Sequence, residues 1–200
     1  MRIVLAAVVA SLGAGAVSAN EPDGGTLGNL QSAFQGESNA HAKYLAFAGK
    51  ADAEGYAGAA QLFRAAARAE QIQAGAHAEV IESMGGEAVA KIETPAVSTT
   101  RENLQVALAG ETYERDQMYP GFLARARKDG NARAVGTLNL ARNAEIEHAK
   151  LYQAALDDLE KLRDAGAPVW VCSVCGYTSR TLPAKCPSSF SPREKFERID

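Results

Sequence analysis

Three cysteines near the C-terminus have the spacing of a metal-binding knuckle. Cys172 and Cys175 form a CxxC pair, and Cys186 follows after ten intervening residues. A second CxxC pair would complete the four thiolates of a tetrahedral zinc or iron site, but the fourth position is Ser189. The sequence therefore predicts a site with three thiolates that holds iron or zinc, with a serine oxygen or a water as the fourth ligand. The alternative is that the knuckle has lost its metal and persists only as a fold.

A second set of potential ligands lies on the apolar faces of predicted helices, where a core would normally be apolar. A buried, unpaired carboxylate costs several kcal/mol or changes its protonation state, so several in one bundle are tolerated only with cations. The Glu-x-x-His spacing of Glu145 and His148 also places a carboxylate and an imidazole on adjacent turns of one helix face. The candidate metal ligands are Glu37, Glu70, Glu111, Glu114, Glu145 and His148.

Di-iron carboxylate bundles are built from such a set, with one Glu from each of two helices and Glu-x-x-His from each of the other two. This chain has that set of ligands with one exception. Gln73 stands three residues after Glu70, at the position where the second Glu-x-x-His would have its His. His77 lies one turn beyond Gln73, and direct ligation by it would need an unusual helix geometry. We therefore expect His77 to be a buried histidine that is not a ligand. His41, four residues after Glu37, is expected to be a solvated residue at the rim.

Four long segments with a helical hydrophobic period position these side chains. The first two cover about residues 26–53 and 59–84, and the long connection "EAVAKIETPAVST" after them predicts a crossover rather than a tight turn. Thr99 and Glu102 predict a capping box that begins the third helix. Pro120 lies inside that helix, where we expect a kink or a local break, with Met118 and Phe122 on the inward face. The fourth helix follows the turn "KDGNA".

Composition agrees with this mainly α-helical chain. It has 200 residues, of which 46% are hydrophobic and only 6% aromatic, and Ala dominates the apolar set. Such a composition favours closely packed helices. The formal net charge is −3 and no Lys/Arg stripe is present, so the sequence excludes nucleic acid as a partner. From Trp170 onward the helical period ends, and short segments rich in Gly, Pro and Ser surround the cysteines. This pattern predicts a small β-containing domain.

Residues 1–19 are predicted to be a signal peptide. Arg2 precedes the apolar run "IVLAAVVASLGAGAV", and "VSA" ending at Ala19 offers a small-x-small cleavage site. The alternative is an uncleaved N-terminal anchor. Cleavage predicts an exported, periplasmic protein with no membrane attachment, in an oxidising compartment. An odd number of cysteines excludes a complete disulfide framework there, but a Cys172–Cys175 disulfide remains a third possibility for the knuckle.

Taken in order from Leu27 to Ile199, the chain resembles the rubrerythrin family. The matching stretches are "AFQGESNAHAKY", "FRAAARAEQIQA", "LAGETYERDQMYPGF", "NAEIEHAKLY" and "VCSVCGYT…KCPSSFSPREKF". The resemblance implies a ferritin-like four-helix bundle over 20–165 with two irons on the six ligands named above. It also implies a rubredoxin-like domain over 166–200, whose iron (or zinc) is held by Cys172, Cys175 and Cys186.

The function that this resemblance implies is reduction of hydrogen peroxide to water by a homodimer. The rubredoxin-like iron would receive electrons from a donor protein and pass them to the di-iron pair. Tyr44 and Tyr119 match tyrosines of the family, and we expect them to hydrogen-bond and orient the carboxylate ligands. The candidate proton relay is Glu114 or a water near Gln73.

Two departures from the family pattern bear on that function. Gln73 replaces a His that takes the place of a Glu, here Glu114, when the family's site is reduced. Either Glu114 stays bound in both states, or the reduced iron keeps an open or water-filled position. Ser189 replaces the fourth Cys, and a harder oxygen donor predicts a more labile iron with a lower reduction potential. An iron-binding or ferroxidase protein with an impaired tail is therefore the alternative function. A structural protein with zinc in the tail and metal-free helices is a third, and the buried carboxylates argue against it.

Overall fold

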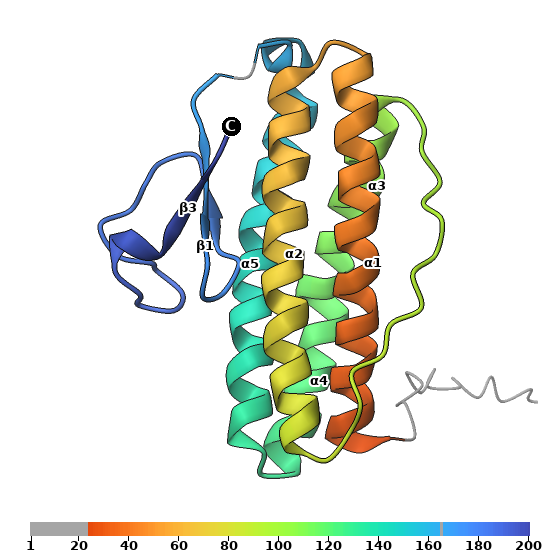
Figure 1. Ribbon diagram of the computed structural model, residues 1–200, viewed down its shortest axis with the longest axis vertical. Coiled ribbons are helices and arrows are strands. Elements are labelled where there is room, and N and C mark those ends of the chain that lie inside the picture. The colour runs from red at the N-terminus through yellow and green to blue at the C-terminus, as the bar shows by residue number, and fades with distance from the viewer. Residues whose placement is uncertain (1–23, 165) are drawn as a thin grey trace, which may run out of the picture.

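The helical periods of the sequence form a bundle of four helical columns, with a small sheet against one side (Figure 1). The structure is a computed structural model that describes residues 24–164 and 166–200. The predicted signal peptide at 1–19 lies outside the described residues. The helices are α1 (Gly25–Ala53), α2 (Ala57–Ser83), α3 (Thr100–Tyr113), α4 (Tyr119–Lys128) and α5 (Ala132–Asp157). The third column consists of α3 and α4, joined by the π-helical segment η1 (Glu114–Met118). The prediction of a mainly α-helical bundle is confirmed.

Two apolar clusters fill the bundle and leave a polar layer between them. One cluster holds a group of aromatic rings, among which Phe47 and Phe63 pack edge to face with centroids 5.4 Å apart. The other holds Leu30, Ile81, Tyr119 and their neighbours. Along α1 the chain leaves the second cluster after Ala33 and enters the first at Ala40. Helix α5 runs between the clusters in the same order, and α2 runs in the opposite order. The candidate metal ligands lie in this interval of each helix.

The connection between α2 and α3 runs the length of the bundle, as the crossover prediction required (Figure 1). Side chains of α1 hold it in place, because Gln35 and Asn39 hydrogen-bond the backbone of Lys91, and Asn39 also that of Glu93. The predicted capping box begins α3, with both reciprocal contacts between Thr99 and Glu102 present.

Pro120 produces the predicted local break, but the break changes which residues face inward. Proline has no N–H to donate to the preceding turn, and the chain accommodates this with the five-residue π segment η1. A π turn adds one residue, so the inward stripe advances from the Met118 position to Tyr119, which is fully buried. The prediction that Met118 and Phe122 face inward was therefore wrong, since both are only partly buried at the edge of the core.

The C-terminal residues form a three-stranded antiparallel sheet of order β2-β1-β3. Its strands are β1 (Val169–Cys172), β2 (Thr178–Ser179) and β3 (Phe196–Ile199), and two short 3-10 turns are η2 (Leu159–Leu162) and η3 (Arg193–Lys195). Val169 and Val171 of β1 pack on Ala65 and Ala69 of α2. The small alanines let the sheet approach α2 closely, so the knuckle lies beside the middle of the bundle. Within 24–164 and 166–200, no helix has both the length and the apolarity needed to cross a bilayer.

Candidate metal centres

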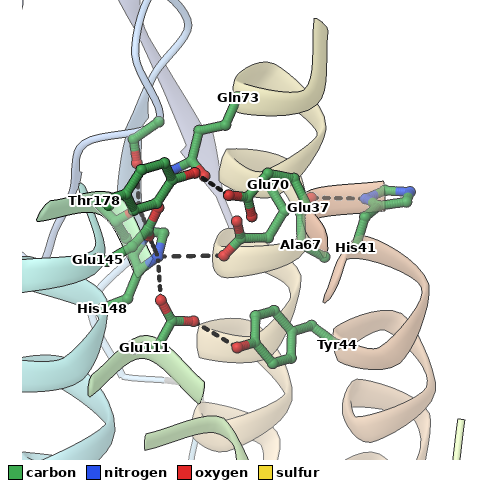
Figure 2. Close-up of polar contacts among 12 residues, drawn as sticks. Glu37, His41, Tyr44, Ala67, Glu70, Gln73, Glu111, Glu145, His148 and Thr178 are labelled. Carbon is green, nitrogen blue, oxygen red and sulfur yellow. Dashed lines mark hydrogen bonds and ion pairs between the residues drawn. The ribbon is translucent and has the colours of Figure 1, made fainter. Parts of the chain in front are cut away.

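All six predicted bundle ligands converge in the polar layer, and Figure 2 shows five of them, Glu37, Glu70, Glu111, Glu145 and His148. Five of them are at most 1% exposed, and Glu114, on the π segment, is half-buried. Their ligand atoms form two groups, each with all atoms within 4.8 Å of one another. Glu145 belongs to both groups, so its carboxylate lies where two ions would share it. The first group is Glu70, Glu111, Glu145 and His148, and the second is Glu37, Glu114 and Glu145.

Several atoms of this layer have no hydrogen-bond partner within the described part of the chain. An ionised carboxylate only accepts hydrogen bonds, and burying such an acceptor without a donor costs free energy. Here the unpartnered acceptors face one another, so in their ionised form they need protons or cations between them. Oxygen and imidazole ligands suit iron, and the donor set therefore fits a pair of iron ions. The unpartnered atoms are Glu37 Oε2, both Glu70 oxygens, Glu111 Oε2, Glu145 Oε1 and His148 Nδ1.

The pKa values of the carboxylates in the metal-free layer also indicate that this layer binds cations. Burial, followed by the charges of Glu145 and Glu111, raises the pKa of Glu70 to about 8. Burial also raises the pKa of Glu37, Glu114 and Glu145 well above the ordinary value. Without cations the layer therefore holds protons, and metal binding must displace them.

The raised pKa values of these carboxylates predict how the stability of the metal-free protein depends on pH. The pKa of Glu70 is about 8 in the folded state against 4.5 in the unfolded chain, so the folded state binds more protons between these values. The free energy of unfolding must then fall as pH rises. Calorimetry of chelator-treated protein is expected to give a lower Tm at pH 8 than at pH 5.5, with a smaller difference in Glu70→Gln. A Tm that is equal or higher at pH 8 would contradict the buried placement of these carboxylates.

The knuckle orients the single histidine of the site. The Thr178 hydroxyl donates to the Gly176 carbonyl at 2.9 Å, so its oxygen accepts from His148 Nε2, which lies 3.0 Å away. Although burial opposes it, the neighbouring carboxylates of Glu111, Glu145 and Glu70 raise the pKa of His148 well above its usual value in the metal-free layer. A metal at Nδ1 would displace the proton there and leave the other proton on Nε2. His148 Nδ1 lies 3.0 Å from Glu145 Oε2 and 3.4 Å from oxygens of Glu70 and Glu111. A partner of this kind fixes both the tautomer and the ring orientation of a metal-binding histidine.

The two predicted tyrosines each hold one oxygen of a carboxylate. Tyr44 donates to Glu111 Oε1 at 2.5 Å, and Tyr119 donates to Glu37 Oε1. Burial raises the pKa of both phenols well above the usual range, so they remain protonated donors. Each contact leaves the second carboxylate oxygen free for a metal, which is the geometry that an orienting role requires.

The three remaining polar residues of this region differ in how they relate to the site. Gln73 reaches it, with Nε2 3.5 Å from Glu145 Oε2. His77 belongs to neither metal group, since its ring nitrogens contact Tyr119 and Thr137. The expectation that His41 is a solvated rim residue was wrong. It is half-buried, and its Nδ1 lies 2.7 Å from the carbonyl of Ala67, so it ties α1 to α2 (Figure 2).

The cysteines form the second candidate centre, with Ser189 at its fourth corner. All three thiols are buried, and Cys175 Sγ lies 3.7 Å from Cys186 Sγ. Ser189 Oγ lies 3.5 Å from Cys172 Sγ, while the Ser189 amide approaches Cys186 Sγ at 3.5 Å. The serine oxygen therefore occupies the place of the missing sulfur. The hydrogen bond with Cys175 lowers the pKa of Cys172 to about 5, which favours the thiolate that a metal requires.

The two candidate centres are connected through the loop that follows Cys175. Gly176, with φ of +77°, lies so close to α2 that a Cβ there would be 3.0 Å from Gln73 Nε2 and 3.1 Å from the Ala69 carbonyl. Two residues later, Thr178 contacts His148. The sequence did not predict a role for Thr178. Its contact with His148 joins residues of two structural units, and no local sequence pattern indicates such a contact.

Comparison with known proteins agrees with both centres. The profile of the family described as rubrerythrin matches residues 28–156, and that of the rubrerythrin rubredoxin-like domain matches 170–197. Nigerythrin of Nitratidesulfovibrio vulgaris is 39% identical over 175 residues, which are 86% of each chain. Rubrerythrin-2 of Clostridium acetobutylicum is 35% identical over 84% of this chain and 93% of its own length.

Solved structures give the same answer. The fully reduced, all-ferrous state of nigerythrin superposes with a TM-score of 0.83 at 34% identity, over 98% of this chain and 100% of the other. Bacterioferritin BfrA of Mycobacterium tuberculosis, with a TM-score of 0.63 at 22% identity, shares the helical fold alone. On both the sequence and the structural comparisons, this chain is a member of the rubrerythrin family.

Proposed function

We propose that this protein reduces hydrogen peroxide to water in the helical bundle, with electrons supplied through the cysteine centre. Proteins of the rubrerythrin family bind two irons in the bundle and one at the rubredoxin-like cysteine site, and are generally oxidoreductases. The reaction consumes one peroxide, two electrons and two protons, and yields two waters. The observation that carries the proposal is the contact of Thr178 with His148, because it couples the loop after Cys175 to a ligand of the bundle site.

Different residues of the bundle site have different proposed roles in this reaction. Irons held at this site would supply Lewis acidity and the two electrons for cleavage of the O–O bond. Glu37, Glu70, Glu111, Glu145 and His148 are proposed to hold them, and the two tyrosines hold the carboxylates in orientation. Glu114 is the proposed proton carrier, because it is half-buried and lies on the π segment, where π turns often mark functional sites.

The electron route begins at the cysteine centre and has few steps. From Cys175 it follows the backbone to Gly176, whose carbonyl accepts from Thr178, which in turn contacts His148 Nε2. The exported location, the homodimer and a donor protein that supplies the cysteine centre belong to this same proposal.

Ser189 favours a second candidate function. If the serine prevents the cysteine centre from cycling, the bundle would oxidise ferrous iron without being re-reduced, and the protein would be a ferroxidase or an iron binder. Sustained turnover of peroxide with an added donor would favour the enzyme. A single oxidation followed by accumulation of iron would favour the binder.

Stopped-flow mixing tests the peroxidase proposal. The reduced, iron-loaded protein is mixed separately with hydrogen peroxide and with oxygen at equal concentration. We expect oxidation by peroxide to be much the faster of the two. A faster reaction with oxygen would overturn the assignment of peroxide as the substrate.

The cysteine centre has its own test at Ser189. Because sulfur is a softer donor than oxygen, Ser189→Cys is expected to raise the reduction potential of the iron and to slow its loss to a chelator. Ser189→Ala should speed that loss. The charge-transfer spectrum, redox titration and chelator kinetics of both variants measure these effects. Ser188→Ala is the matched control, since the Ser188 hydroxyl contacts Asn143. Identical potentials in wild type and Ser189→Cys would show that residue 189 does not face the metal.

A further inference from the structure

His77 is a fully buried histidine that neither metal group uses. It is 0% exposed, and burial lowers its pKa to about 4, so the ring is neutral. Ile81, one turn further along α2, and Leu138, next to Thr137 on α5, belong to the apolar cluster that also contains Tyr119. A polar ring in such surroundings costs free energy unless both of its nitrogens are satisfied. Both are: Nε2 lies 3.2 Å from the Tyr119 hydroxyl, and Nδ1 lies 3.0 Å from the Thr137 hydroxyl.

These contacts form a chain with one direction. Glu37, as a metal-binding carboxylate, can only accept, so the Tyr119 proton points to Glu37 Oε1. The Tyr119 oxygen must then accept from His77 Nε2–H. The neutral ring consequently has an unprotonated Nδ1, which accepts from the Thr137 hydroxyl. Thr137 donates to His77, His77 donates to Tyr119, and Tyr119 donates to Glu37. All three hydrogen bonds therefore point toward the metal site.

The chain also crosses the bundle from its less buried side to its centre. Thr137 on α5 is 9% exposed, whereas His77 on α2, Tyr119 on α4 and Glu37 on α1 are each 0% exposed. The four residues belong to four different helices, and apolar side chains of one core cluster surround the middle of the chain. Glu37 is fully buried, so a proton that reaches it needs an internal route, separate from the one proposed for the half-buried Glu114.

We propose that Thr137, His77 and Tyr119 form a proton relay that delivers protons to Glu37 at the bundle site. This rests on the proposed function, which consumes two protons per peroxide. In one delivery, the Thr137 proton moves to His77 Nδ1, the Nε2 proton moves to the Tyr119 oxygen, and the Tyr119 proton moves to Glu37. Water returns a proton to Thr137. One proton is transferred overall, no electron moves, and the relay residues end with their charges unchanged. His77 is left with its proton on Nδ1, so the ring must turn over and the two hydroxyls must rotate back before the second proton is delivered.

Thr137 is the member at which the relay can be interrupted with the least disturbance. Thr137→Val keeps the shape of the side chain and removes the hydroxyl, and Thr137→Ser keeps the hydroxyl. In the reduced, iron-loaded protein, Thr137→Val is expected to slow the single oxidation by peroxide about 10-fold or more, because positioned proton donors contribute about 100-fold or more. Thr137→Ser should restore most of that loss. Both variants should contain as much iron as the wild type.

A second readout does not depend on activity. The chain has 3 histidines, so ¹⁵N NMR of the zinc-loaded protein resolves each ring, and His77→Gln assigns the relevant signals. We expect the Nε2–H tautomer for His77, with a hydrogen-bonded Nδ1 whose shift moves to that of a free imine nitrogen in Thr137→Val only. An Nδ1–H tautomer in the wild type, or equal peroxide rates in Thr137→Val and the wild type, would overturn the relay. A wild type that shows the NMR signature but does not react with peroxide would instead overturn the proposed function.

Discussion

Replacing Glu145 by Gln is expected to remove iron from both halves of the bundle site. Its carboxylate belongs to both groups of ligand atoms, so one substitution affects two ions. The neutral amide keeps the size of the side chain but loses the charge that a pair of buried cations requires. Loss of an outer partner of a metal ligand already costs about 10–100-fold in affinity or activity. We therefore expect more than about a 100-fold loss of peroxide reduction.

Iron analysis together with the peroxide assay measures this effect. Glu147→Gln is the matched control, because Glu147 lies two residues away on the same helix, is half-buried and pairs with Lys150 instead of the site. Full iron content in Glu145→Gln would show that Glu145 is not shared between the two ions. The cysteine centre should remain loaded in both variants.

Replacing Cys175 by Ala is expected to separate the two centres functionally. The substitution removes one of three thiolates and should abolish the thiolate-to-iron charge-transfer bands, while the bundle keeps its iron. A single oxidation of chemically reduced protein by peroxide should proceed at the wild-type rate, because the bundle residues are untouched. Sustained turnover with a reduced electron-transfer protein as the donor should fall more than about 100-fold, since the ligands of the bundle site are buried and such a donor cannot contact them.

The comparison of single and sustained turnover identifies the defect. Ser173→Ala is the control, since Ser173 lies in the same loop and its hydroxyl donates to the Lys195 carbonyl, away from the sulfurs. Undiminished sustained turnover in Cys175→Ala would show that electrons enter the bundle by another route. The ferroxidase alternative predicts no sustained turnover even in the wild type.

The sequence was sufficient to predict the helices and the six side chains that meet in the polar layer, because both depend on spacing within one helix. A carboxylate at a position that helical periodicity places in the core is a local signal, and Glu-x-x-His adds a second ligand on the same face. The spacing of the three cysteines, and the serine at position 189 where a fourth cysteine is expected, can likewise be recognised within one short segment. These residues could be assigned before any contact between helices was known.

What the sequence did not predict depends on contacts between elements. The π segment before Pro120 shifts the inward stripe by one residue, so that Met118 lies only at the edge of the core. Helical periodicity did not predict this shift, and only the family resemblance had placed Tyr119 at the site. The contact of Thr178 with His148 and that of His41 with the Ala67 carbonyl join residues 30 and 26 positions apart. Helical periodicity gives the direction of a side chain around its own axis, but it does not say which neighbouring helix or loop approaches it.

The central claim is that buried carboxylates from four helical columns share two cations between the apolar clusters. Anomalous diffraction at the iron edge, from crystals of the iron-loaded protein, tests it most directly. We expect two strong peaks in the polar layer, one in each group of ligand atoms, with Glu145 in contact with both. A bundle without anomalous density, while the cysteine centre is occupied, would contradict it.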